Sequence, residues 1–355
     1  MLGVNRRAAQ YAWTVALVAL LLYLVYLVRT TLFVFILALL FAYLLSPLVN
    51  LLDRALPTNR TRTLALGLAY VIFVGVVIIV GIQIGSRVVD EANTLAKKFP
   101  EMLANLERPS PSAPPVINSL KQQILGKVQG QITERSGDIV AAVSKLGLKA
   151  ITVASSLIFV AIIPILAFFF LKDAHLIRQH ILDMVEDGPR RELLDDVMAD
   201  VHLLLAHYMR ALVLLSAAAF TAYNIFFLIV GVPYGVLLGA LAGMLEFIPM
   251  LGPFTAGVTI LIVAAVSGGP VLTVLIFLLV YRLFQDYILS PQLMGQGVEL
   301  HPLLVLFGVF AGAEIAGIAG TFLSVPVLAL VRIVYLRIRR ARLGAHLAPE
   351  TPVHL

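Results

Sequence analysis

Four ionisable side chains lie within long apolar stretches of the sequence: Glu246, Arg282, Asp286 and Glu314. Placing a charged side chain at the centre of a membrane-spanning helix costs about 2.5–3.5 kcal/mol on insertion scales. Such groups therefore face the interior of a helix bundle or a water-filled cavity, where they mark ion or substrate paths. These four residues are the first candidates for chemistry.

Arg282 and Asp286 are four residues apart, so a helix would place them on one face, where they could form an ion pair. Two interpretations remain open for this pair. The two charges either neutralise each other and stabilise the helix, or they also contact a substrate.

The two carboxylates Glu246 and Glu314 each accompany a break in an apolar segment. Each proline removes an amide hydrogen and leaves a carbonyl one turn earlier without its helical partner, and glycine permits turns that other residues resist. A carboxylate beside free carbonyls makes an oxygen-rich site for a cation or a proton. The alternative is that each carboxylate lies in water near a loop. The two breaks contain Pro249, Gly252 and Pro253 in one segment and Gly312, Gly317 and Gly320 in the other.

The composition is that of an all-α integral membrane protein. Of the 355 residues, 60% are hydrophobic and 13% are charged, and the mean hydropathy is +0.98. Soluble domains have about 45–50% apolar and about 25% charged residues. The absence of cysteine excludes disulfides, thiolate metal sites and cysteine nucleophiles.

The net charge of +6 indicates membrane topology rather than nucleic-acid binding, because the basic residues gather at the ends of apolar runs. This arrangement predicts that both termini are cytoplasmic, which requires an even number of crossings. The residues that decide it are Arg6, Arg7, Arg54, Arg60 and Arg62 near the N-terminus and Arg332, Arg337, Arg339, Arg340 and Arg342 near the C-terminus.

The apolar runs predict the domain organisation. Uninterrupted runs long enough to span a membrane cover residues 11–28, 31–49, 63–84, 151–171 and 211–230. We expect N-terminal transmembrane helices (1–84), an extracytoplasmic helical insertion (85–149), a transmembrane helix (150–172), a cytoplasmic amphipathic region (173–210), a transporter core (211–335) and a basic cytoplasmic tail (336–355).

The core contains a span at 271–289 between the two broken segments, 234–266 and 301–331. As single helices these segments would be about 49 Å and about 46 Å long, which exceeds the hydrocarbon thickness. Each is therefore a tilted, kinked span or a hairpin of two half-helices. The sequence predicts about eight membrane segments, or six spans plus two re-entrant hairpins. Interrupted segments often mark the binding site of a secondary transporter.

Two further patterns predict packing. A seam of apolar side chains with Tyr208 at its end is expected to pack on the membrane surface, under its own bundle or against another copy of the chain; its other members are Leu194, Val197, Val201 and Leu204. The pairs Gly239–Gly243 and Gly308–Gly312 are spaced for close helix contacts.

Three sequence runs resemble a signature of the autoinducer-2 exporter family of bacterial membrane proteins. They are LAGMLEFIPMLGPFTA at residues 241–256, QDYILSPQLMG at 285–295 and GAEIAGIAG at 312–320. The order and spacing agree over residues 205–335. Two positions differ from the pattern. The loop has Met250 where the family often has Tyr, and Glu246 stands where Asn is frequent. Both differences concern the substrate.

The resemblance implies a multi-pass transporter of the bacterial inner membrane that exports small molecules, and some members are cation/proton antiporters. It adds Gln285 to the candidate site and implies a homo-oligomeric ring such as a pentamer. No nucleotide-binding loop, nucleophile–base pair or metal-binding motif occurs in the sequence. We therefore expect no enzyme activity, no cofactor and no nucleic-acid partner.

The leading hypothesis is a secondary transporter of a small polar solute or ion, driven by a proton or cation gradient. A sodium/proton antiporter is the alternative within transport. A non-transporting scaffold that binds a partner through residues 85–149 is the alternative outside it.

Overall fold

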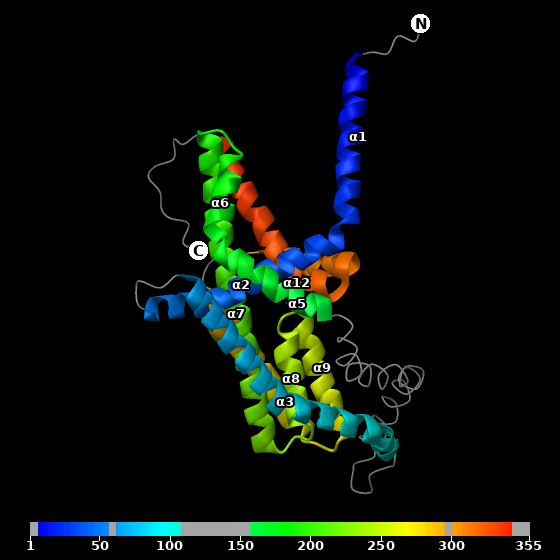
Figure 1. Ribbon diagram of the computed structural model, residues 1–355. Coiled ribbons are helices and arrows are strands. Elements are labelled where there is room, and N and C mark those ends of the chain that lie inside the picture. Colours follow the sequence, from blue (N-terminus) through cyan, green and yellow to red (C-terminus); the bar gives the residue numbers. More distant parts are fainter. Residues whose placement is uncertain (1–5, 57–61, 108–156, 295–299, 343–355) are drawn as a thin grey trace.

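The computed structural model describes residues 6–56, 62–107, 157–294 and 300–342 (Figure 1), and all regular secondary structure in these ranges is helical. In chain order the helices are α1 (Arg6–Leu27), α2 (Arg29–Ala55), α3 (Arg62–Glu107), α5 (Leu157–Lys172), α6 (Ala174–Asp183), α7 (Pro189–Val230), α8 (Gly235–Leu245), α9 (Leu251–Val266), α10 (Val271–Phe284), the π-helix η2 (Gln285–Leu289), α11 (Ser290–Met294) and α12 (Pro302–Arg342).

Within the described ranges, six helical stretches are long and apolar enough to cross a membrane. They are Gln10–Leu27, Arg29–Ala55, Arg62–Phe99, Pro189–Val230, Val271–Leu293 and Pro302–Ala341. Three shorter apolar stretches are Ala161–Lys172, Gly235–Leu245 and Leu251–Val266. The prediction of an all-α membrane protein with several transmembrane helices is thereby confirmed.

Two helices continue through boundaries that the sequence predicted. Helix α3 runs for 46 residues, so the expected start of the insertion at residue 85 lies inside it. Helix α7 runs for 42 residues and joins the amphipathic region to the following span. A change from polar to apolar side chains alters the helix environment but not its backbone hydrogen bonds. The rest of the insertion and the start of the predicted fourth span, residues 108–156, lie outside the described residues.

The first broken segment folds as a hairpin of two short helices. Helix α8 has 11 residues and α9 has 16, which correspond to about 17 Å and about 24 Å of helix. The two helices lie side by side, with the turn at residues 246–250 joining them (Figure 1). Gly252 approaches the Leu245 carbonyl so closely that a Cβ atom there would overlap it.

The second broken segment also folds back on itself, within α12. The helical run is interrupted at Ala316 and at Gly317, whose φ is +61°. Gly312 and Gly320 then pack so tightly that a Cβ atom on either would overlap the other's carbonyl. Eight residues of straight helix would separate them by about 12 Å. Residues 302–315 and 318–342 are therefore two antiparallel arms, named here the first and second arms of α12.

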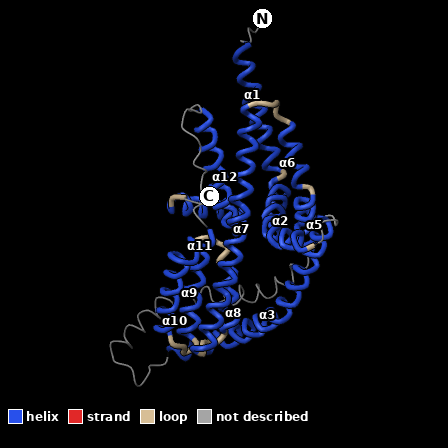
Figure 2. The backbone as a smooth tube through the Cα atoms, turned by 90° about the vertical axis from the view of Figure 1, so that its left-hand side faces the viewer, coloured by secondary structure: helices blue, strands red, loops and turns tan. Residues whose placement is uncertain are grey.

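Helix α7 is the central element of the fold and contacts α2, α8, α11 and α12. Both backbone views place the start of α1, the α6–α7 turn and the end of α12 toward one end of the molecule (Figures 1 and 2). The α7–α8 turn, the α9–α10 connection and the end of α3 lie toward the other end.

The seam on α7 packs against other parts of the same chain. Leu204 and Tyr208 are buried in one cluster with Leu40 of α2 and Leu323 of the second arm, and Val201 packs against it. Of the three surfaces considered from the sequence, the structure therefore provides the chain's own bundle. The seam consequently gives no support for an oligomer.

Both glycine pairs make the close contacts that their spacing predicts. On α8, Gly239 faces Asn224 of α7, and the Gly243 carbonyl accepts a hydrogen bond of 2.7 Å from the Ser216 hydroxyl. On the first arm of α12, Gly308 faces Leu328 of the second arm, beside the Gly312–Gly320 contact. Small residues thus let both hairpins pack closely.

Helix α1 extends away from the rest of the molecule (Figure 1). All the described side chains from residue 10 to residue 28 are exposed, and the main contact of the helix within the described residues is with α2, which it joins. Within the described residues its apolar surface is therefore left for lipid or for another copy of the chain.

Candidate functional site

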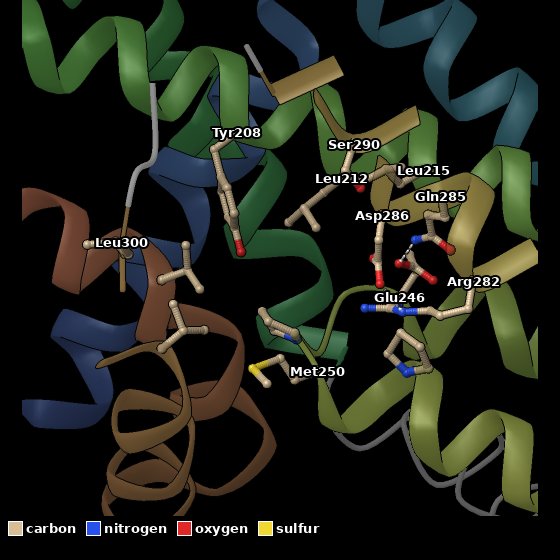
Figure 3. Close-up of a pocket in the computed structure, with 14 residues that line it drawn as sticks. Tyr208, Leu212, Leu215, Glu246, Met250, Arg282, Gln285, Asp286, Ser290 and Leu300 are labelled. Carbon is tan, nitrogen blue, oxygen red and sulfur yellow. Dashed lines mark hydrogen bonds and ion pairs between the residues drawn. The ribbon is translucent and has the colours of Figure 1, made fainter. Parts of the chain in front are cut away.

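A cavity of about 220 Å³ lies where α7, the α8–α9 turn, the α10–α11 region and both arms of α12 meet (Figure 3). It brings together six of the residues predicted from the sequence. The lining residues are Tyr208, Leu212, Leu215, Glu246, Pro249, Met250, Pro253, Arg282, Gln285, Asp286, Ser290, Leu300, Val305 and Val325.

A π-helical turn supplies two of the polar groups. Helix α10 gives way to η2 at Gln285, and the amide of Ser290 donates to the carbonyl of Gln285, five residues earlier. Pro291 explains this widening, because in a regular α-helix its ring would clash with the carbonyl four residues before it. Such turns occur frequently at functional sites. Here the turn presents Gln285 and Asp286 to the cavity together with Arg282.

The charged cluster of Glu246, Arg282 and Asp286, together with Gln285, consists of two pairs. The Gln285 side-chain amide donates a hydrogen bond to the Glu246 carboxylate, and Gln285 is only 3% exposed. Arg282 Nε lies 2.8 Å from Asp286 Oδ2, which confirms the predicted ion pair. Since Arg282 compensates Asp286, the described lining residues together have a formal charge of −1. The carboxylate without an ion-pair partner among them is Glu246, which is half-buried.

The turn that carries Glu246 contains a strained residue. Met250 has φ +62° and ψ −53°, and the amide of Leu251 donates to the carbonyl of Pro249 over 2.7 Å. This is a γ-turn centred on a residue with a side chain, a rare geometry. Sparsely populated backbone conformations cost about 1–3 kcal/mol and gather at functional sites. Met250 also lines the cavity.

The prediction that the prolines leave free carbonyls is wrong for this turn. The Leu245 carbonyl accepts the amide of Ile248 over 2.9 Å, and the Pro249 carbonyl accepts the amide of Leu251. The chain closes tighter turns in which nearer amides replace the missing proline hydrogens. The polar character of the cavity therefore comes mainly from side chains.

Gly252 does not line the cavity but shapes the turn beside it. Only a residue without a Cβ atom can lie as close to the Leu245 carbonyl as Gly252 does. Its role is therefore structural, because it holds the turn that presents Glu246 and Met250.

The second break lies apart from the cavity. Glu314 and Gly317 are exposed at the tip of the α12 hairpin, and Gly312 and Gly320 join the two arms just below it. The hairpin reaches the cavity through Val305 and Val325, away from its tip. Phe247 packs on Phe322, with ring centroids 6.2 Å apart. The α8–α9 turn therefore contacts the second arm of α12 and not the turn at Gly317.

Tyr208 belongs to the site, although the sequence showed it only as the end of the apolar seam. Its hydroxyl is buried, and none of the described residues forms a hydrogen bond with it. Figure 3 shows the side chain pointing into the cavity on the side opposite Glu246 and Arg282. One feature of the sequence could have identified Tyr208 as a site residue: it carries the single polar side-chain atom in an otherwise apolar seam.

Comparison of the sequence with known proteins identifies relatives of this chain. A family model for AI-2E family transporters matches residues 15–340. The chain is 25% identical over 315 residues to YueF of Bacillus subtilis (strain 168), which carries the name of a transport protein; the match covers 84% of this chain and 81% of YueF.

It is 24% identical over 312 residues to PerM of Escherichia coli (strain K12), which carries the name of a permease, and the match covers 84% of each chain. A shorter match, to the transport protein YrrI of Bacillus subtilis (strain 168), is 31% identical over 183 residues and spans about half of each protein, 51% and 52%. Because the family model matches nearly the whole sequence, the protein belongs to the AI-2E transporter family.

Proposed function

We propose that the protein is a secondary transporter that exports a small polar solute or signalling molecule across the bacterial inner membrane, coupled to a proton or cation gradient. The observation that carries this proposal is the half-buried Glu246 carboxylate in a cavity between broken helices. It is hydrogen-bonded to Gln285 and lies beside the Arg282–Asp286 pair.

The coupling follows from the chemistry of this cluster. A carboxylate with one amide donor and no ion-pair partner in the cavity lining can exchange a proton for a cation. The chain contains no Gly-x-x-x-x-Gly-Lys motif, so ATP does not drive transport within this chain. The strained turn at Met250 is the proposed moving element, because stored backbone strain favours a switch between two conformations.

The proposed topology has both termini in the cytoplasm. It is supported by the basic residues at the ends of the chain and by the common location of the start of α1, the α6–α7 turn and the end of α12. Reporter fusions after residues 190 and 345 should report the same, cytoplasmic side. Opposite sides would make the number of crossings odd and overturn the topology.

We also propose a homo-oligomer, with a ring such as a pentamer as the expected form. The supporting observation is α1, whose apolar side chains have no partner within the described chain apart from its junction with α2. A neighbouring copy would cover part of this surface. A monomeric mass in mild detergent over a wide range of protein concentrations would exclude the oligomer.

Proteoliposomes test the transport proposal directly. The purified chain is reconstituted, and efflux of candidate polar solutes is followed under imposed pH and sodium gradients. We expect solute efflux that depends on one gradient and falls at least tenfold in Glu246→Gln. The matched control is Glu314→Gln, which changes a carboxylate outside the cavity.

The same experiment distinguishes the alternatives. The net negative charge of the cavity would also suit a sodium/proton antiporter, which would exchange sodium for protons without any organic solute. If neither solute, sodium nor protons move above the background of empty vesicles, the transport proposal fails and the scaffold alternative gains.

A further inference from the structure

The Tyr208 hydroxyl can donate and accept hydrogen bonds, but it forms none with the charged cluster. Tyr208 is 3% exposed, and its hydroxyl has no partner among the described residues. A buried polar group is normally hydrogen-bonded, and each exception calls for an explanation. Because the side chain lines the cavity, a group that occupies the cavity is the candidate for the missing partner.

This hydroxyl and the charged cluster lie on opposite sides of the cavity. In Figure 3, Glu246, Arg282 and Asp286 gather on one side and Tyr208 projects from the other. Apolar side chains line the cavity as well, among them Leu212 and Met250. The cavity therefore has two polar regions and an apolar wall.

An inorganic cation bound at Glu246 would not use both polar regions. The oxygen ligands of a hard cation such as Ca²⁺ surround it at about 2.3–2.6 Å and converge on one point. Tyr208 and Glu246 approach from opposite sides of a cavity of about 220 Å³ that is partly lined by hydrocarbon. A small organic molecule satisfies both polar regions and covers the apolar wall, as is usual for ligand sites.

The charge of the cavity selects the end of the ligand that lies near Glu246. Arg282 compensates Asp286 over 2.8 Å, so the lining residues that the structure describes have a formal charge of −1, carried by Glu246. A protonated amine complements this charge and supplies donors for the carboxylate. The opposite end of the ligand meets a neutral phenol, which donates to or accepts from a hydroxyl or carbonyl group.

We infer that the cavity binds a small organic cation with a hydrogen-bonding group at its far end, and that Tyr208 recognises that group. This inference rests on the proposed transport function, because it names the class of solute for the same site. It makes Tyr208 a residue that determines specificity.

The chain offers a matched control for Tyr208. The hydroxyl of Tyr281 is likewise buried and without a partner among the described residues, but Tyr281 does not line the cavity. Replacing either tyrosine with phenylalanine removes one such hydroxyl and keeps the ring. Any effect of losing a buried polar atom on folding should therefore be similar in both variants, whereas an effect on ligand selection should be confined to Tyr208→Phe.

The experiment measures binding to the purified full-length chain in detergent, separately from transport. The probes are radiolabelled linear amino alcohols from aminopropanol to aminohexanol, competed with alkylamines of equal length. For at least one length, we expect the wild-type chain to bind the amino alcohol about 3- to 10-fold more tightly than the alkylamine, as one added hydrogen bond implies. Tyr208→Phe should abolish this ratio, Tyr281→Phe should keep it, and Glu246→Gln should weaken both probes.

Three outcomes would overturn the inference: equal affinities for the two probe series in the wild-type chain, an unchanged ratio in Tyr208→Phe, or binding of sodium without binding of any amine. The first two leave the transport proposal intact if gradient-driven efflux persists. Conversely, the expected binding pattern without movement of any solute, sodium or proton in proteoliposomes would uphold the site and refute transport.

Discussion

The hairpin of α8 and α9 and the hairpin formed by the two arms of α12 each contain a break in an apolar helix and one carboxylate. In the first, Glu246 lies in the cavity and is hydrogen-bonded to Gln285. In the second, Glu314 lies at an exposed tip, and only Val305 and Val325 reach the cavity. The same local pattern thus serves a polar site in one hairpin and a packing element in the other. The neighbours in space, rather than the break itself, make the difference.

The largest effect is expected from Asp286→Asn, which leaves Arg282 without its ion-pair partner beside the first hairpin. The two side chains are 41% and 45% exposed in the isolated chain, and within a membrane an uncompensated charge on this helix is costly. We expect a several-fold lower yield of folded protein in the membrane and loss of transport, as measured by fluorescence-detected size-exclusion chromatography and proteoliposome flux.

The double variant Arg282→Gln with Asp286→Asn provides the control for this prediction. It removes both charges, so the yield should recover while transport stays low. A full yield of Asp286→Asn alone would show that the pair does not stabilise the fold and would weaken its place in the site.

The comparison of the hairpins is tested most directly by neutralising each carboxylate. Glu246→Gln should lower gradient-driven efflux at least tenfold, because it removes the charge that has no ion-pair partner among the described lining residues. Glu314→Gln should stay within about twofold of the wild-type rate, because the side chain is exposed and outside the cavity. The sequence pattern alone favoured an effect at both positions. Equal losses in the two variants would restore that view.

A smaller effect is expected where each hairpin packs through glycine. A Cβ atom at Gly312 would overlap the backbone carbonyl of Gly320, which cannot move without opening the second hairpin. At Gly239 the overlapping group is the side chain of Asn224, which can rotate away. We expect Gly312→Ala to destabilise the protein by about 1–3 kcal/mol, a typical cost of overpacking, and Gly239→Ala by less. Heating series followed by size-exclusion chromatography would rank the two, and the reverse order would contradict the packing described.

The smallest expected effect concerns the strained turn of the first hairpin. Met250→Ala and Met250→Gly both remove the side chain, but only glycine adopts φ +62° without strain. We expect the glycine variant to be more stable than the alanine variant by about 1 kcal/mol. An alanine variant that is equally stable would mean that the turn relaxes and stores no strain.

The features that were predicted correctly from the sequence depend on residues that lie close together in the chain. The excess of apolar side chains determined that the chain is helical and crosses a membrane, because an isolated apolar segment must satisfy its own backbone in lipid. The four-residue spacing of Arg282 and Asp286 was sufficient for their ion pair. The four-residue spacing of Gly239 and Gly243, and of Gly308 and Gly312, was likewise sufficient to predict close helix contacts.

Other features depended on residues far apart in the chain. Glu246 meets Gln285 across 39 positions, and Tyr208 reaches the cavity from a third helix. No periodic pattern in the sequence indicates which of the two breaks lies beside Gln285 and Tyr208. Glu314 was therefore as good a candidate as Glu246. The π-helical turn before Pro291 and the fold-back at Gly317 were likewise unpredicted in detail.

The sequence by itself determined that this is a helical membrane protein with breaks and carboxylates in its core, because composition and spacing act through the local backbone. Only the tertiary structure decided that one carboxylate is hydrogen-bonded in a cavity while the other lies at an exposed tip. The physical reason is that the environment of a charge depends on what packs around it, and that packing is assembled from α7, α8, α10 and α12 together.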